Sequence, residues 1–265
     1  MIRIQKIEEP EILIINKVAW TNHLMDLVQE YGTYSLIPKS IRDAAIRYYY
    51  HDDIKNALIG VNVRAKSIYC ESYVDITGYS NIEHFHPKSL FPRETFDWDN
   101  LFVGCTLCNT PKNDFDTVNE PFIHPVNEDP EILLTFSECM YEPRNQNQKA
   151  QNVIDKCNLQ RLPLIRAHSD LLLSFYKSRE ALKERINKYN GHISANKKIK
   201  DAYDIYIALD NLKQEAADDS QYAGYMRYLL RKFNEIRNAV TIINNHKEDL
   251  GLATDFDWGF NYSLI

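Results

Sequence analysis

Two short stretches hold most of the chemically active side chains of this chain: IEHFHPKS at residues 82–89 and DWDNLFVGCTLCNTPK at residues 97–112. Together with the residues just upstream, they collect two histidines, a neighbouring carboxylate, two asparagines, a lysine and three of the five cysteines in the chain. These residues are Glu83, His84, His86, Asn100, Asn109, Lys112, Cys70, Cys105 and Cys108. No other segment has this density, so we expect the rest of the chain to hold and orient this one.

The local sequence predicts the order strand, loop, strand, helix around the two stretches. Residues 68–77 (IYCESYVDIT) are rich in β-branched and aromatic residues, which favours a strand, and TGYSN is a turn signal. Pro87 and Pro92 exclude a regular helix in the segment that follows. DWDNLFVGC then fits a second short strand or a loop, and CTLCNTPKND fits a turn into a helix.

The side chains match the needs of phosphodiester hydrolysis, which are a base, a cation and a group that places the phosphate. His84 is the natural general base, because imidazole titrates near neutral pH. Glu83 and Asn109 offer the hard oxygens that Mg²⁺ prefers, and Lys112, expected at a helix N-terminus, suits a phosphate oxygen. Since neighbours on a strand point to opposite faces, Glu83 and His84 need an irregular strand end to converge, and Pro87 favours one.

The cysteines indicate a structural metal site. Cys105 and Cys108 form a CxxC pair, and Cys70 lies upstream, with Ser67 at the position that would complete a second pair. Four thiolates in two such pairs are typical of structural zinc. With three thiolates, two alternatives stay open: a fourth ligand from elsewhere, such as His124, or a site in which packing has replaced the metal.

Composition predicts a globular, helical protein. The 265 residues are 44% hydrophobic and 12% aromatic, which is enough for a substantial core. No apolar run approaches the ~18 to 20 residues of a bilayer span, and MIRIQKIEEP has charges where a signal peptide is apolar. We therefore expect a cytoplasmic protein with reduced thiols and no membrane contact. The net charge of −6 argues against a broadly basic surface, so local patches or a partner must hold any nucleic acid.

We expect three regions along the chain. Residues 1–64 form an N-terminal helical scaffold, with helices over 10–31 and from about 38 and about 52, and residues 65–145 hold the metal-binding loops. The polar segment EPRNQNQKAQN at 142–152 precedes a C-terminal helical domain at 153–265. This domain is expected as one long helix ending at Gly191 and two more, at about 194–217 and 220–244. Its lysines and arginines fit either a solvated face or a contact surface for nucleic acid or a partner.

The order of EH with a proline three residues after the histidine, then DNL, then CxxCN followed by lysine resembles the HNH, or ββα-metal, endonuclease motif. More narrowly, IYCES, IEHFHPKS, WDNLFVGCTLCNTPK and EPFIHPVNEDPEILL are similar to the HNH family of PtuB-type nuclease subunits. These subunits occur in Septu antiphage systems and in some retron defence systems. The resemblance implies a mainly α-helical fold with a small ββα-metal core, wrapped by N-terminal and C-terminal helices.

By the same resemblance, Glu83 and Asn109 bind a catalytic Mg²⁺ or Mn²⁺ and His84 is the general base. Asn100 holds the loop that orients this base. The structural zinc ligands implied are Cys70, Cys105 and Cys108.

Two positions depart from the family pattern. Ser67 replaces the first zinc cysteine, which puts zinc occupancy in question. His86 stands where the family more often has an arginine, so its role stays open between phosphate contact and packing.

The implied function is endonucleolytic cleavage of DNA or of RNA, including tRNA, in an antiphage complex with a PtuA-type ABC ATPase. A retron reverse transcriptase with its msDNA is a further partner that the resemblance allows. The sequence has no GxxxxGK[ST] motif, so ATP hydrolysis is expected in another chain. The alternative function is that of a catalytically inactive zinc-hairpin scaffold that binds proteins of the same complex.

Overall fold

The computed structural model describes residues 1–61, 65–74 and 80–263. Helices account for most of these residues, and the strands found among them form two small antiparallel sheets of two strands each. The expectation of a mainly α-helical protein is therefore confirmed. No helix in the described ranges combines the length and the apolar character that crossing a bilayer requires. The chain divides into two compact units, Met1–Thr135 with Tyr141–Arg161, and Phe136–Met140 with Leu162–Ile265.

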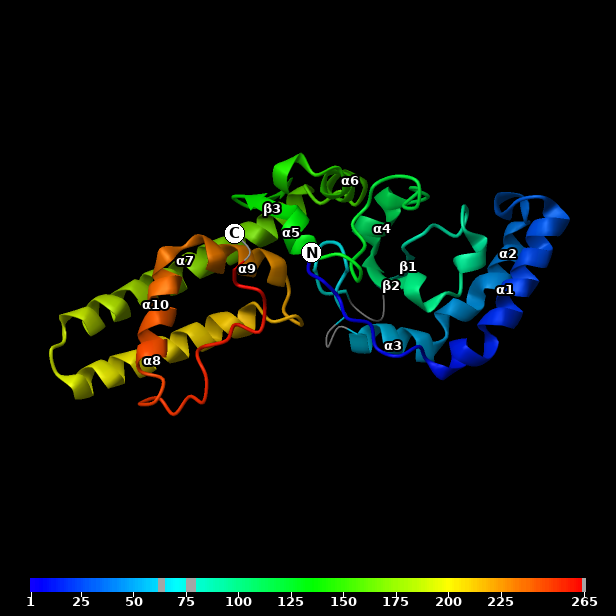
Figure 1. The fold of residues 1–265 in the computed structure, drawn as a ribbon. Helices are drawn as coiled ribbons and strands as arrows, with labels where there is room; N and C mark the ends of the chain where they lie inside the picture. The colour runs from blue at the N-terminus through cyan, green and yellow to red at the C-terminus, as the bar shows by residue number, and fades with distance from the viewer. Residues whose placement is uncertain (62–64, 75–79, 264–265) are drawn as a thin grey trace. The chain divides into compact units, whose positions relative to one another are not determined.

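The first unit begins with a helical scaffold, in which α1 (Glu11–Tyr31) and α2 (Lys39–Ile46) lie side by side and α3 (Asp52–Val61) follows (Figure 1). Short 3-10 turns at Tyr34–Leu36 and Arg47–Tyr50 connect them. Gly32, with a φ of 87°, follows α1, because a left-handed residue ends a helix at low cost only when it is glycine. The three helices expected in this region are thus confirmed.

Two short strands and a helix follow, and the first strand lies later in the chain than the one expected over 68–77. β1 (Ser80–His84) and β2 (Leu101–Cys105) pair antiparallel, with Ser80 opposite Cys105 and His84 opposite Leu101. α4 (Thr106–Lys112) starts directly after β2 and packs against both strands. The loop between the strands contains 3-10 turns at Pro92–Glu94 and Trp98–Asn100.

The strand expected over 68–77 is wrong for residues 68–74. The chain turns there instead: Ser67 N donates to Ser72 O (3.0 Å), Glu71 N donates to Ser67 O (2.9 Å), and Glu71 has a φ of 60°. Ile68 and Tyr69 point their apolar bulk into the core from this turn, so packing overrides their β propensity. The rest of the expected strand, residues 75–77, lies outside the described residues.

Beyond α4 the chain forms α5 (Pro130–Leu133), β3 (Leu134–Ser137), β4 (Met140–Pro143), a 3-10 turn at Arg144–Gln146 and α6 (Gln148–Lys156). Asp129 caps α5 by accepting a hydrogen bond from Glu131 N (3.0 Å), and Pro130 occupies the first turn, where its missing N–H is not needed. α6 begins inside the polar segment 142–152, where Asn147 caps it through Ala150 N (3.1 Å).

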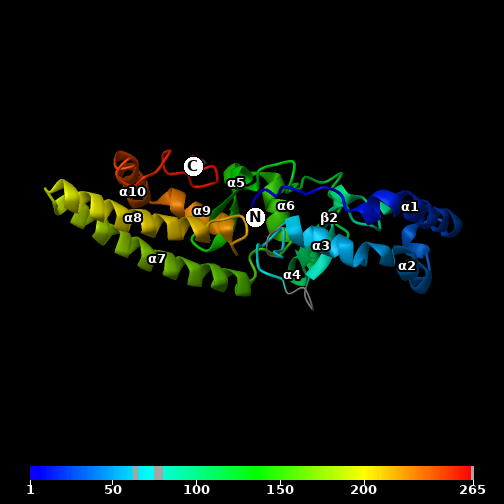
Figure 2. The same cartoon turned by 90° about the horizontal axis from the view of Figure 1, so that it is seen from below.

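The second unit is a helical bundle made of α7 (Leu162–Gly191), α8 (Ala195–Glu215), α9 (Ala223–Lys232) and α10 (Asn234–Asn245). α7 and α8 run side by side and α10 packs on both (Figure 2). Three helices follow Gly191 where two were expected, because Phe233 is extended (φ −107°, ψ 128°). The Phe233 ring packs 5.5 Å from the Phe175 ring, and the Arg179 guanidinium lies 4.2 Å from its centroid, which holds the break in place.

Candidate functional site

An open cleft of about 510 Å³ lies between the ββα segment and the N-terminal scaffold. Its walls come from the end of β1, the loop after it and α4, and from α2 with the turn at Tyr34–Leu36. Three of the expected site residues, Glu83, His84 and Asn109, line this cleft. The three residues therefore border one common cleft.

His84 is a buried imidazole at the last position of β1. Its Nε2 lies 2.9 Å from Thr95 O, and because a carbonyl oxygen can only accept, we assign the ring proton to Nε2 and the lone pair to Nδ1. Burial lowers the pKa of His84 well below its ordinary value, and the charge of Lys88 lowers it further. The ring is thus neutral, with Lys88 Nζ 3.4 Å from Nδ1 and the Tyr49 ring packed edge-on. A general base requires this protonation state.

Glu83 and Lys112 form a buried ion pair, each about 1% exposed at its side chain. Lys112 Nζ lies 2.7 Å from Glu83 Oε1 and donates a second hydrogen bond to His84 O (3.0 Å). The Tyr69 hydroxyl also donates to Glu83 Oε1 (3.0 Å), and burial raises the pKa of Tyr69 well above its ordinary value, so the hydroxyl keeps its proton. The three contacts fix the carboxylate and the backbone of the base together.

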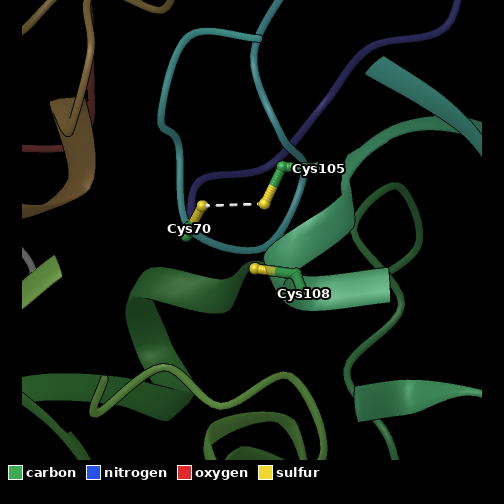
Figure 3. A group of neighbouring side chains, drawn as sticks. All are labelled: Cys70, Cys105 and Cys108. Carbon is green, nitrogen blue, oxygen red and sulfur yellow. Dashed lines mark hydrogen bonds between the residues drawn. The ribbon is translucent and has the colours of Figure 1, made fainter. Parts of the chain in front are cut away.

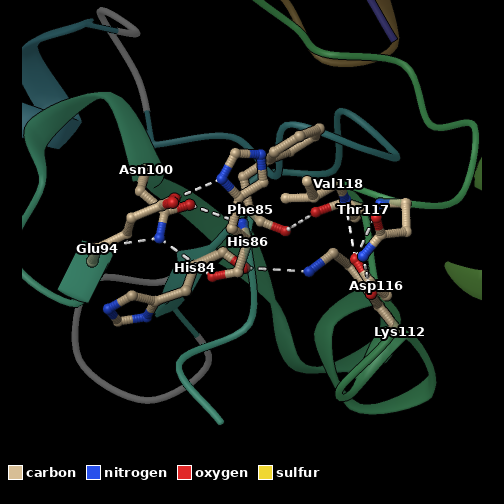
Figure 4. A network of polar contacts seen from close by, with 10 residues as sticks. His84, Phe85, His86, Glu94, Asn100, Lys112, Asp116, Thr117 and Val118 are labelled. Carbon is tan, nitrogen blue, oxygen red and sulfur yellow. Dashed lines mark hydrogen bonds and ion pairs between the residues drawn. The ribbon is translucent and has the colours of Figure 1, made fainter. Parts of the chain in front are cut away.

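The expected location of Lys112 at a helix N-terminus is wrong. Lys112 is the last residue of α4, because the helix already starts at Thr106, directly after β2. Its side chain points inward toward the His84 carbonyl (Figure 4), and its ammonium contacts His84 O and Glu83 Oε1. The chemistry of this position is therefore that of a positioning residue, and a phosphate needs another cation.

Gly104 lets the two possible magnesium ligands approach one another. A Cβ atom at this position would lie 3.0 Å from the Cβ of Glu83 and 3.9 Å from the Cβ of Asn109. The first distance is tighter than most contacts between side-chain carbons, so a larger residue at position 104 would push Glu83 by a few tenths of an ångström. A carboxylate and an amide oxygen thus face one cleft, and this donor set suits Mg²⁺, which keeps several of its own waters.

Asn100 ties the two ends of the loop that follows the base. Its Oδ1 accepts from His86 N (2.6 Å), and its Nδ2 donates to His86 O and Glu94 O, both at 3.0 Å (Figure 4). The His86 ring is half-buried, with Nδ1 2.5 Å from Glu94 Oε2 and neighbouring contacts to Phe85 and Phe91. Asn100 and His86 thus both stabilise the conformation of this loop.

Cys70, Cys105 and Cys108 come together from the turn at 68–70, the end of β2 and α4 (Figure 3). All three are buried, their sulfur atoms lie within 4.8 Å of one another, and the Cys70 and Cys105 sulfurs are 3.7 Å apart. A tetrahedral zinc ion with Zn–S bonds of about 2.3 Å holds its sulfurs about 3.8 Å apart. The cluster therefore has the spacing to bind a metal ion such as zinc.

His124 is not part of this cluster, so its candidacy as a fourth zinc ligand is wrong for the described chain. Its Nδ1 accepts hydrogen bonds from Val126 N (3.2 Å) and Asn127 N (3.3 Å), and its ring packs against Phe85 and Phe102. Burial lowers the pKa of His124 to about 4. The neutral imidazole of His124 thus stabilises the turn by accepting these two hydrogen bonds.

Arg161 contacts the cysteines, because it donates to Cys108 Sγ (3.4 Å) and to Asn158 O (3.1 Å), and Ser72 Oγ lies 3.3 Å from Cys70 Sγ. Three thiolates and one zinc ion carry a net negative charge, which a guanidinium at this distance offsets. Ser67 contributes differently, because its hydroxyl accepts from Cys105 N (3.3 Å). Arg161 had no sequence signal, since it lies 53 residues beyond Cys108, in the connection between α6 and α7.

Arg42 and Lys88 also line the cleft, although sequence reasoning selected neither. Lys88 had a weak signal, since it follows His84 by four residues within IEHFHPKS. Arg42 had none, because only the folded scaffold brings α2 to the motif. The pKa of Lys88 is lowered by burial.

No family model matches the chain. The chain is 28% identical over 206 residues to the Septu protein PtuB of Bacillus thuringiensis, which covers 74% of this chain and 78% of that protein. It is 31% identical over 111 residues to the Septu protein PtuB of Bacillus mycoides (strain KBAB4), covering 36% of this chain and 38% of that protein. These similarities support a PtuB-type relationship.

Purified protein should contain about one zinc ion per chain, because thiolate ligands at tetrahedral spacing favour zinc over most other metal ions. The Cys108→Ser variant should lose the metal and melt at a lower temperature. The matched control is Cys139→Ser, which changes a half-buried cysteine outside the cluster and should keep the metal. Elemental analysis by mass spectrometry gives the metal content, and zinc retained in full by Cys108→Ser would contradict this site.

The depressed pKa of His124 predicts a loss of stability in acid. The folded pKa is about 4 and the unfolded value is about 6.5, so only the unfolded state gains a proton between them. The contribution is complete above about pH 6.5 and is lost as the pH falls toward 4. His124→Asn retains an acceptor for the turn but does not titrate, so its melting temperature should fall less between pH 7 and pH 4.5. Identical pH profiles for the two proteins would rule out this role.

Proposed function

We propose that this chain is the nuclease subunit of an antiphage defence complex and hydrolyses phosphodiester bonds by the HNH, or ββα-metal, mechanism. The observation that carries the proposal is the convergence of His84, Glu83 and Asn109 on one cleft, with His84 neutral and its Nδ1 lone pair accepting a long hydrogen bond from Lys88 Nζ (3.4 Å), for which an anionic substrate would compete. The succession of β1, β2 and α4, in which the base ends the first strand and Asn109 lies in the helix, supports a ββα-metal core.

In this proposal His84 Nδ1 accepts a proton from the attacking water as the water oxygen bonds to phosphorus and the bond from phosphorus to the 3′ oxygen breaks. Thr95 O holds Nε2–H, so the ring keeps the tautomer in which Nδ1 faces the reaction. Glu83 and Asn109 would hold Mg²⁺ or Mn²⁺, which supplies charge stabilisation at the phosphate and the leaving oxygen when bound. The Tyr69 hydroxyl and the shortest contact of Lys112 both go to Glu83 Oε1, so Oε2 is the oxygen that would bind a cation.

Asn100 and Lys112 act as positioning residues in this scheme. Asn100 holds the loop after the base through three backbone hydrogen bonds, and Lys112 holds the backbone carbonyl of His84 itself. We assign His86 to packing within the same loop, since its ring is engaged by Glu94. Zinc on Cys70, Cys105 and Cys108 would be structural and would pin α4 to the turn at 68–70.

The biological setting rests on the PtuB similarity, which suggests a component of a Septu antiphage system. We propose that the partner is a PtuA-type ATPase, as the resemblance implies, and that nucleic acid is the substrate. The two relatives are named as Septu proteins, and they lend no support to a retron reverse transcriptase and msDNA as partners. In this setting, the helices of the second unit offer surface for partner or nucleic-acid contact.

The catalytic assignment is tested with His84→Ala and Asn109→Ala. Each should reduce Mg²⁺-dependent cleavage of nucleic acid by about 10²- to 10⁴-fold, because a base or a metal ligand is removed while the fold remains. The matched controls are His23→Ala and Asn56→Ala, which change exposed residues of α1 and α3 outside the cleft and should cleave normally. Folded His84→Ala protein that cleaves at the wild-type rate would refute the mechanism. If His84→Ala also leaves phage defence in cells intact, that result supports the alternative function, a catalytically inactive scaffold.

Activity should depend on the ATPase partner. The chain carries a net charge of −6, so its autonomous hold on a polyanion is expected to be weak, and an ungated nuclease is toxic to its host. Adding the ATPase should therefore raise cleavage of phage DNA, plasmid or total cellular RNA by about tenfold or more. Equal and robust cleavage by the isolated chain would argue against gating.

A further inference from the structure

Two basic side chains reach the His84 cleft from different elements, Arg42 from α2 and Lys88 from the loop after β1. Both are partly buried, and each lies against an aromatic ring. The Arg42 guanidinium is 5.3 Å from the Tyr34 ring centroid, and Lys88 Nζ is 5.1 Å from the Tyr49 ring centroid. Rings hold the two cations over the cleft without neutralising them.

Neither cation is within ion-pair distance of a carboxylate in residues 1–61, 65–74 and 80–263. Lys112 shows the contrast, because its ammonium is 2.7 Å from Glu83 and is thereby neutralised. A cation that is partly removed from water without an anion costs free energy, and an anionic ligand recovers it. Arg42 and Lys88 are therefore prepared for an anion that arrives from outside the chain.

The position of Lys88 relates this anion to the chemistry. Lys88 Nζ is 3.4 Å from His84 Nδ1, the nitrogen that carries the lone pair. An oxygen bound to Lys88 is consequently within one water molecule of the base. This is where the phosphate under attack has to lie if His84 removes a proton from an in-line water.

We propose that Arg42 and Lys88 form a phosphate clamp that grips the nucleic-acid backbone at the bond to be cleaved. This inference rests on the proposed nuclease function and assigns its substrate contacts. The guanidinium can engage two non-ester oxygens at once, and the ammonium supplies a compact point charge. Because both contact phosphate, the clamp holds DNA or RNA of any sequence.

Two exposed carboxylates on the same cleft, Asp43 and Asp114, limit what the clamp does alone. They repel a polyanion, so we expect a divalent cation beside Glu83 to strengthen the binding that the two basic residues provide.

The test measures binding separately from cleavage, on the His84→Ala protein. A fluorescein-labelled oligonucleotide is titrated in Ca²⁺ over a series of salt concentrations, and affinity is read from fluorescence anisotropy. Adding Arg42→Gln or Lys88→Gln should weaken binding severalfold and reduce the slope of log affinity against log salt by about 0.7 to 0.9 for each phosphate that is no longer neutralised. Arg42→Lys and Lys88→Arg, which keep the charge, should recover part of the affinity.

The matched controls are Arg47→Gln and Lys39→Gln. Arg47 lies 5.2 Å from the Tyr48 ring centroid, as Arg42 lies on Tyr34, but it does not line the cleft. Lys39 is an exposed lysine on α2. Both controls should bind like the parent protein, and circular dichroism checks that every variant is folded.

The outcomes separate the clamp from the nuclease function. Unchanged affinity and salt slope in Arg42→Gln and Lys88→Gln, or no binding by the parent, would overturn the clamp even where His84→Ala abolishes cleavage. If His84→Ala leaves cleavage unchanged, the nuclease mechanism fails while the binding data still decide on the clamp. In the protein with an intact His84, clamp variants should raise KM more than they lower kcat.

Discussion

The candidate site depends on one buried ion pair, Lys112 with Glu83, because it joins the strand that ends in the base to the helix that carries the amide. Two charges removed from water are stable only as a pair, and losing one partner of a buried pair typically costs about 3–5 kcal/mol. Lys112 also donates a hydrogen bond to the His84 carbonyl, and the Tyr69 hydroxyl donates one to the Glu83 carboxylate. The position of His84 thus depends on a buried ion pair that lies next to it.

Helix α4 concentrates three tasks in five residues. Cys108 and Lys112 are spaced by one helical turn and are both buried, so one face of the helix carries the cysteine cluster and the ion pair. Asn109, the neighbour of Cys108, is turned to the cleft. Because the same short helix anchors the metal cluster and presents the amide, disorder at the cysteines would displace the candidate magnesium ligand.

Local patterns were enough to predict the helices of the scaffold and the helix that contains the CxxCN residues, and they selected His84, Glu83 and Asn109, which line one cleft in the structure. Predictions from local patterns were wrong where contacts with residues distant in the sequence determine the local structure. The turn at 68–70 buries side chains that have strand propensity, and His124 satisfies backbone amides instead of joining the cysteines. The contributions of Arg42 and Arg161 arise from segments far from the motif, and only tertiary structure brings a helix to a cleft or a guanidinium to a thiol.

Asn100 makes its three hydrogen bonds to main-chain atoms alone. These hydrogen bonds fix the backbone at both ends of the loop. They do not involve the side chains of the residues between those ends. Exposed positions of this loop, such as Leu90, can therefore differ among related proteins with little effect on the backbone around Asn100. The rim of the cleft can thus change in sequence while the arrangement of His84, Glu83 and Asn109 stays the same.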